Sequence, residues 1–213
     1  MNNSFLQLML VTNKHNIPTD AYLQFVEACL KAGVTSVQLR EKSLQLKQFL
    51  QFGQSLKYLL DSYNVPLIVN DQLEACIKLK ANGIHLGQSD TPITTARAAL
   101  GPDKIIGLSV NTITEAQNAQ TYSQSIDYIG VGPIFPTNNK PNVQTVWGLT
   151  GLTQVALLSS LPIVAIGGID TDNAASVMRA GATGIAAIGL FHNAQDPFLI
   201  TKNLITIITK ANQ

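Results

Sequence analysis

Eight short apolar segments alternate with amphipathic segments along the 213 residues of the chain, and this alternation constrains the fold most strongly. Each strand candidate is rich in Val, Ile and Leu, and together they span 5–11, 35–40, 66–70, 83–86, 105–109, 127–131, 162–166 and 183–188. Eight strands that are each followed by a helical pattern predict an α/β fold, a (β/α)8 TIM barrel forming one domain over 1–213. A doubly wound open sheet is the alternative.

Composition narrows the classes of function. Fourteen basic and 13 acidic residues give a net charge of +1, so no strong field attracts nucleic acid or an anionic membrane. No apolar run approaches the roughly 18 residues that a membrane helix needs, and no basic leader precedes the first apolar run, so we expect a cytoplasmic protein. Cys29 and Cys76 lie in amphipathic patterns and are expected to be buried free thiols. The oligomeric state is open, with a homodimer as one candidate.

The stretch TSVQLREK, residues 35–42, stands out because only one face of this strand candidate is apolar. Its apolar side chains are Val37 and Leu39, and its polar ones are Gln38, Arg40 and Lys42. In a barrel the apolar face packs against helices, and the polar face points inward or toward the C-terminal mouth, where this fold builds active sites. Polar groups there need partners. Two cations and an amide therefore predict an anionic ligand.

Polar side chains also follow the other strand candidates at their carboxyl ends. They are Asn70, Asp71, His85, Gln88, Asp90, Ser109, Asn111, Thr137, Asn139 and Lys140. Asp71 and Asp90 follow adjacent strands, and two carboxylates beside a diphosphate are a common way to hold Mg²⁺. Each could instead cap the helix that follows it. His85 is compatible with a hydrogen-bonded core histidine as well as with a functional one.

Two anion sites are predicted at this end of the barrel. Arg40, Lys42 and Lys140 form a candidate phosphate clamp, although Glu41 and Lys42 could also be ordinary solvated charges. Lys140 belongs to a long segment, 132–149, of the length expected for a functional loop. Glycines in AIGGID and AAIGLF, after strands seven and eight, are typical of backbone phosphate sites, or of tight turns without a ligand. The layout indicates metal-assisted diphosphate handling by a transferase.

Seven stretches, taken together and in order, resemble the thiamine phosphate synthase family between about residues 6 and 191. They are VQLREK, VNDQ, GIHLGQSD, IIGLSVNT, DYIGVGPIFPTNNK, PIVAIGGI and GATGIAAIG. The resemblance implies a barrel enzyme that joins hydroxymethylpyrimidine diphosphate to hydroxyethylthiazole phosphate with Mg²⁺. The products would be thiamine phosphate and diphosphate, so the partners would be small molecules rather than nucleic acid or a membrane.

The resemblance also implies a role for each matched residue. Mg²⁺ would be held by Asp71 and Asp90, and the pyrimidine diphosphate by Gln38, Arg40, Lys42 and Asn70. The catalytic residues would be Ser109, at the pyrimidine and the leaving group, and Lys140. The residues closing over the substrates would be Thr137, Asn139 and Lys140, and those receiving the thiazole phosphate would be Gly168, Ile188 and Gly189.

Three positions depart from the family pattern. Asn139 stands where the family loop usually has Thr, Gly189 where many members have Ser, and Asn111 where relatives often have His. Thiazole tautomerases share the scaffold but tend to lose the metal carboxylates and the loop Lys, and rely on that His. The presence of both carboxylates and of Lys140 therefore favours the synthase. A non-catalytic thiamine-pathway binding or regulatory barrel is the remaining alternative, and it would need no Mg²⁺ site.

Overall fold

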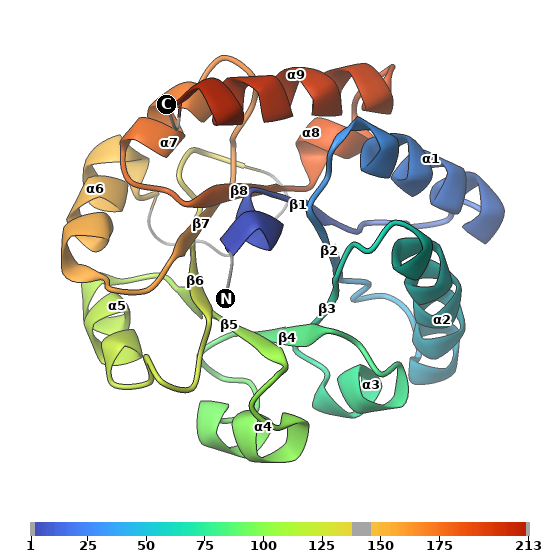
Figure 1. The fold of residues 1–213 in the computed structure, drawn as a ribbon, viewed down its shortest axis with the longest axis horizontal. Coiled ribbons are helices and arrows are strands. Elements are labelled where there is room, and N and C mark those ends of the chain that lie inside the picture. Colours follow the sequence, from blue (N-terminus) through green and yellow to red (C-terminus); the bar gives the residue numbers. More distant parts are fainter. Residues whose placement is uncertain (1–2, 138–145, 212–213) are drawn as a thin grey trace.

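Eight parallel strands close into a barrel in the computed structural model, which describes residues 3–137 and 146–211 (Figure 1). Strands adjacent in sequence are adjacent in the barrel, and the last pairs with the first. The strands are β1 (Leu8–Val11), β2 (Ser36–Leu39), β3 (Leu67–Asn70), β4 (Gly83–Leu86), β5 (Ile105–Val110), β6 (Tyr128–Val131), β7 (Ile163–Ile166) and β8 (Gly184–Ala187). The predicted (β/α)8 barrel is therefore confirmed, and the open sheet is excluded.

A ring of helices surrounds the barrel (Figure 1). They are α1 (Thr19–Ala32), α2 (Leu46–Ser62), α3 (Leu73–Lys78), α4 (Ile93–Leu100), α5 (Ile113–Gln120), α6 (Gly148–Leu158), α7 (Ala174–Arg179), α8 (Gly189–His192) and α9 (Pro197–Ala211). Local sequence sets several of their ends. Gly33 ends α1 in the left-handed region, at φ 117°, a conformation that glycine adopts readily. Thr112 caps α5 by accepting a hydrogen bond from the N–H of Glu115.

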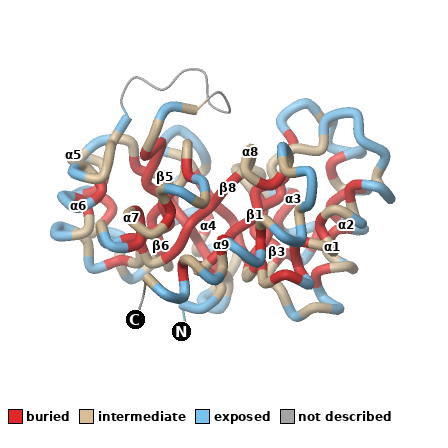
Figure 2. Tube along the Cα trace, turned by 90° about the horizontal axis from the view of Figure 1, so that it is seen from above, coloured by how far each residue is buried: buried red, intermediate tan, exposed pale blue. Residues whose placement is uncertain are grey.

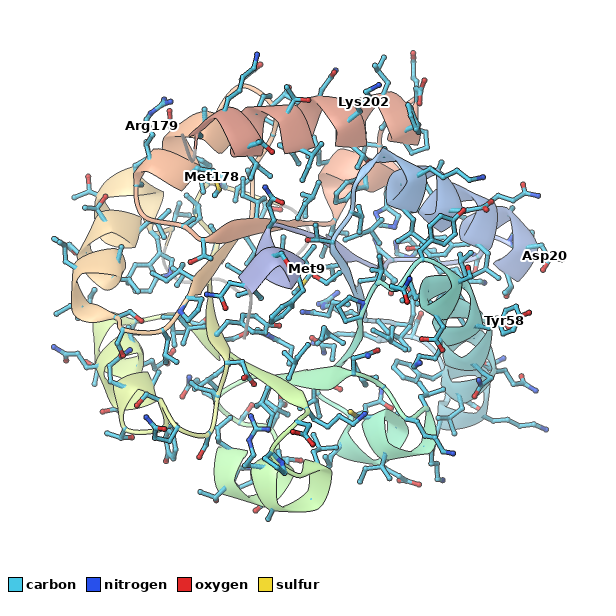
Figure 3. All side chains as sticks on the ribbon, viewed as in Figure 1. Met9, Asp20, Tyr58, Met178, Arg179 and Lys202 are labelled. Atoms are coloured by element: carbon cyan, nitrogen blue, oxygen red, sulfur yellow. The ribbon has the colours of Figure 1, made fainter. Side chains whose placement is uncertain are left out.

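Apart from polar positions such as Gln38 and His85, the strands are apolar on both faces because each face meets a different part of the core. Outward side chains pack beneath the helices, and Val37 and Leu39 belong to this layer, as predicted. Inward side chains form a separate cluster that includes Met9, which lies near the barrel axis (Figure 3). The tube in Figure 2 shows the strands as a buried band, with exposed segments around it. The barrel is thus a filled core rather than a pore.

The first strand is shorter than predicted. Residues Asn3–Leu6 form a 3₁₀ helix, η1, so the predicted strand 5–11 begins three residues too early. The Leu6 side chain is fully buried in the inner cluster with Met9 and Tyr128. Leu6 is therefore apolar because η1 covers one end of the barrel (Figure 1) and buries this side chain there, not because Leu6 belongs to a strand.

Both cysteines are buried and free, as predicted. Burial raises the pKa of Cys29 and of Cys76 to about 11, so both remain thiols at neutral pH. In the part of the chain that the structure describes, none of the helices has the length and apolar character needed to cross a membrane.

Candidate active site

The carboxyl ends of the strands surround a cavity of about 1080 Å³. Inner-cluster side chains such as Met9 and Tyr128 line its base. Every predicted site residue that the structure describes lines this cavity: Gln38, Arg40, Lys42, Asn70, Asp71, Asp90, Ser109, Thr137, Gly168, Ile188 and Gly189. Asn139 and Lys140 lie outside the described residues, so their contacts stay predictions. The fold therefore brings together side chains that are widely separated in sequence.

The polar face of β2 points into this cavity. Gln38 is only 6% exposed, and its Nε2 lies 3.6 Å from Sδ of Met9, inside the barrel. The backbone N–H of Arg40 donates to Oγ1 of Thr12 at 2.9 Å, and this hydrogen bond fixes the backbone at Arg40. Within residues 3–137 and 146–211, neither Arg40 nor Lys42 forms an ion pair with a carboxylate. Among the described residues, both charges therefore line the cavity without a carboxylate in direct ion-pair contact, although both act on Asp71 at longer range.

Glu41, between these two cations, is not a solvated surface charge. The residue is 5% exposed, and its two carboxylate oxygens accept the backbone N–H of Lys14 at 2.9 and 3.1 Å. The sequence alternative of an ordinary exposed charge is therefore wrong for Glu41, although Lys42 is exposed. A buried carboxylate needs hydrogen-bond donors, and here the donor ties the loop after β2 to the loop after β1.

Asp71 and Asp90 do not cap the helices that follow them. Oδ2 of Asp71 accepts from Nδ2 of Asn70 at 2.7 Å, and Oδ2 of Asp90 accepts from the N–H of Gly87 at 2.6 Å. Helices α3 and α4 begin after residues whose side chains make no capping hydrogen bond. The capping interpretation is therefore wrong for both carboxylates, which hold local loop geometry and line the cavity instead.

The two carboxylates interact electrostatically. Burial raises the pKa of Asp71 above its ordinary value, and the like charge of Asp90 raises it further. The cations Lys42 and Arg40 act in the opposite direction, Lys42 more strongly. Asp71 also has a left-handed backbone, with φ 55°. Incompletely compensated carboxylate oxygens at the cavity wall are ligands suited to a hard divalent cation.

Ser109 belongs to a hydrogen-bonded row that sequence reasoning missed. Nε2 of His85 lies 2.8 Å from Oγ of Ser109, and its Nδ1 lies 2.9 Å from Oη of Tyr128. Two strand glycines give the imidazole its space, since a Cβ on Gly107 would lie 2.6 Å from Nδ1 and one on Gly130 2.9 Å from Cε1. His85 is thus a hydrogen-bonded buried histidine that also lines the cavity.

A signal for this row was present in the sequence. Gly107 pairs with His85 across β4 and β5, and Gly130 pairs with Ser109 across β5 and β6. Glycine inside a strand marks a place where another group approaches closely. The sequence alone does not give the register between neighbouring strands, and without that register the approaching group cannot be identified as the His85 imidazole.

The far side of the cavity is built by the loops after β7 and β8. Gly168 has φ 66°, and a Cβ there would lie 2.7 Å from Cβ of Phe135, so both conformation and space require glycine. Ile188 and Gly189 line the cavity where the short helix α8 begins. The sequence predicted no helix between β8 and the last helix, because a single turn is too short to show periodicity. His192 is the last residue of α8, and its Nδ1 lies at hydrogen-bonding distance, 2.8 Å, from the carbonyl oxygen of Ile188.

A closed parallel barrel with a polar cavity at the carboxyl ends of its strands defines the (β/α)8-barrel class, in which active sites are built at this end. The sequence model described as thiamine monophosphate synthase matches residues 8–191. The thiamine-phosphate synthase of Chlamydia abortus is 50% identical over 210 residues, which cover 99% of this chain and 98% of the relative. That of Methanobrevibacter smithii is 40% identical over 205 residues, 96% of each chain.

A solved structure gives the same result. The thiamine phosphate pyrophosphorylase from Pyrococcus furiosus superposes with a TM-score of 0.87 at 32% identity, over 99% of each chain. The chain therefore belongs to the thiamine monophosphate synthase family, and formation of thiamine phosphate is the enzymatic activity that this membership assigns to it.

Proposed function

We propose that this chain joins hydroxymethylpyrimidine diphosphate to hydroxyethylthiazole phosphate in the cavity at the strand ends, with release of diphosphate. One observation carries the proposal: the cations Arg40 and Lys42 line the same cavity as the carboxylates Asp71 and Asp90, without pairing to them. Cations that are not neutralised by protein carboxylates are suited to an anionic substrate.

The diphosphate is held at the ends of β2 and β3. Arg40 offers a planar pair of donors to phosphate oxygens, and Lys42 adds a mobile point charge. Gln38 and Asn70 supply amide groups that line the same wall. Because Glu41 fastens the loop between the two cations, they reach the substrate from a fixed backbone.

Asp71 and Asp90 fit a Mg²⁺ ion. Their free oxygens are hard ligands, and a cation would offset both the burial and the repulsion from Asp90 that raise the pKa of Asp71. Among the described residues, no group of three His, Cys, Asp or Glu side chains is placed to hold a metal ion, so the remaining ligands would be water and substrate oxygens. Bound Mg²⁺ supplies charge neutralisation for the departing diphosphate.

The chain's own residues then need to do little covalent chemistry. The bond between the pyrimidine methylene carbon and the diphosphate oxygen breaks, and its electron pair leaves with the diphosphate. The electron-rich aminopyrimidine stabilises the resulting cation, and the thiazole nitrogen donates its lone pair to form the new carbon–nitrogen bond. Ser109 contacts the pyrimidine and the leaving group, and Arg40 and Lys42 stabilise the charge that develops on diphosphate. The apolar base of the cavity limits the access of water.

The thiazole phosphate binds on the opposite wall. Backbone groups at Gly168, Ile188 and Gly189 line that wall, where this fold often binds phosphate. Thr137, with Asn139 and Lys140, would close over both substrates. We further propose that the chain acts as one domain over 1–213 in the cytoplasm; a homodimer is the assembly to test.

The tautomerase and regulatory alternatives have less support. A barrel that only binds thiazole phosphate needs neither cations nor carboxylates on the opposite wall. This chain has two of each there: Arg40, Lys42, Asp71 and Asp90. The test is incubation with both substrates and Mg²⁺, followed by chromatography for thiamine phosphate. Bound substrates without product would favour the regulatory alternative. Isomerisation of a thiazole carboxylate phosphate without condensation would favour the tautomerase.

A further inference from the structure

A second hydrogen-bonded row lies beside the cavity, between α1 and α8. Tyr22 is fully buried on α1, and its Oη lies 2.7 Å from Nε2 of His192. The two rings stack with centroids 5.7 Å apart, and Phe25 packs on the imidazole with centroids 5.0 Å apart. The proposed reaction gives neither Tyr22 nor His192 a task. Buried polar groups nevertheless require partners, so the row needs an explanation.

The direction of each hydrogen bond follows from the two ends of the row. The carbonyl oxygen of Ile188 can only accept, so Nδ1 of His192, 2.8 Å away, carries a proton. In the neutral ring Nε2 is then an acceptor, and the Tyr22 hydroxyl donates to it. The Tyr22 oxygen in turn accepts the backbone N–H of Asn13 at 3.0 Å. Burial lowers the pKa of His192 and raises that of Tyr22, which keeps both groups in these neutral forms.

The row ends on a peptide group at the cavity wall. Besides His192 Nδ1, the Ile188 carbonyl accepts the backbone N–H groups of Phe191 and His192, each at 3.2 Å. In a trans peptide the C=O and the following N–H point in opposite directions. Because the Ile188 carbonyl is turned toward α8, the N–H of Gly189 is turned away from α8. Gly189 itself lines the cavity.

We propose that Tyr22 and His192 are positioning residues for the thiazole phosphate subsite, holding the Ile188–Gly189 peptide so that its N–H stays available to the phosphate. This inference rests on the proposed function, which places that phosphate at Gly189. The row starts at Asn13, next to the Lys14 N–H that Glu41 accepts. The β1–α1 loop therefore supports both walls of the cavity.

Replacement of the imidazole tests the proposal. His192→Phe keeps an aromatic ring but removes the hydrogen bond to Ile188, whereas His192→Asn can keep a donor near the position of Nδ1. We expect the KM for hydroxyethylthiazole phosphate to rise roughly tenfold in His192→Phe, as for a lost buried hydrogen bond. The rise should be smaller in His192→Asn. It should also be smaller in Tyr22→Phe, which removes only the hydroxyl and leaves the bond between His192 and Ile188. The KM for the pyrimidine diphosphate should stay near the wild-type value in all three variants.

A matched control separates positioning from general destabilisation. Val26 is fully buried one turn further along α1 from Tyr22, and Val26→Ala lowers stability through lost packing while every hydrogen bond of the row keeps its donor and acceptor. Val26→Ala should lower the thermal midpoint without changing either KM. If His192→Phe raises both KM values equally, or if Val26→Ala reproduces its effect, the positioning role is overturned.

Calorimetry with hydroxyethylthiazole phosphate alone gives the same comparison without turnover. The Kd should rise in His192→Phe by the same factor as the KM, and an unchanged Kd overturns the proposal. Wild-type protein that binds the thiazole phosphate but makes no thiamine phosphate would instead contradict the proposed function. The two failures are therefore distinguishable.

Discussion

His85 bridges Ser109 and Tyr128, with Nε2 2.8 Å from the serine hydroxyl and Nδ1 2.9 Å from the tyrosine hydroxyl. The serine that the proposed reaction uses is therefore oriented from inside the barrel. The strand glycines that make room for the imidazole show that this part of the barrel is built around the ring.

Loss of the imidazole should impair the reaction more than loss of the tyrosine hydroxyl. His85→Phe removes both hydrogen bonds and should lower kcat by roughly 10- to 100-fold, in the range of a mispositioned polar group. Tyr128→Phe leaves the bond to Ser109 and should have a smaller effect. Steady-state kinetics on the folded variants measures both. Equal effects, or none in His85→Phe, would show that the imidazole does not orient Ser109.

The buried carboxylate of Glu41 should contribute to stability. Glu41→Gln keeps the shape but weakens the charge-assisted bonds to the Lys14 N–H, and should lower the free energy of unfolding by about 1–2 kcal/mol. The KM for the pyrimidine diphosphate should rise as well, because Arg40 and Lys42 flank this residue. Urea unfolding and kinetics measure the two effects. Glu74→Gln, which removes the charge from an exposed pair with Lys78, is the control and should change little.

Asp71 should lower stability while serving the reaction. Its charge is disfavoured by burial and by Asp90, so Asp71→Asn should raise the thermal midpoint at neutral pH and abolish Mg²⁺-dependent turnover. Asn also tolerates the left-handed backbone at this position. Thermal unfolding with and without Mg²⁺ measures the effect. The exposed Asp103→Asn is the control, and a lower midpoint in Asp71→Asn alone would contradict the electrostatic interpretation.

Stability should fall on the acid side of neutrality through His192. Burial lowers its pKa below the ordinary value of 6.5, with His15 acting in the same direction and the Ile188 carbonyl in the opposite one. The unfolded chain therefore binds the proton more readily, and the free energy of unfolding should decrease as the pH drops below about 6.5. His192→Asn should flatten this part of the pH profile. An unchanged slope would mean that another group titrates there.

The sequence was sufficient to predict the barrel, because strand and helix periodicities repeat eight times and leave few other topologies. It also predicted part of the cavity lining, since polar side chains such as Arg40, Asp71 and Asp90 follow buried strands. It could not reveal Glu41 as a buried anchor, because burial of that carboxylate depends on a backbone N–H at Lys14, in another loop. The hydrogen bond between Tyr22 and His192 likewise could not be predicted from the sequence, because the two residues are 170 positions apart.

The most direct measurement compares wild-type protein and Asp90→Ala with both substrates, in the presence of Mg²⁺ and in the presence of a chelator. We expect wild-type protein to release one diphosphate for each thiamine phosphate formed, only with Mg²⁺. Asp90→Ala should stay folded, bind hydroxyethylthiazole phosphate normally and make no detectable product. Full Mg²⁺-dependent activity in Asp90→Ala would remove this carboxylate from the metal site, and wild-type protein without product would contradict the proposed condensation itself.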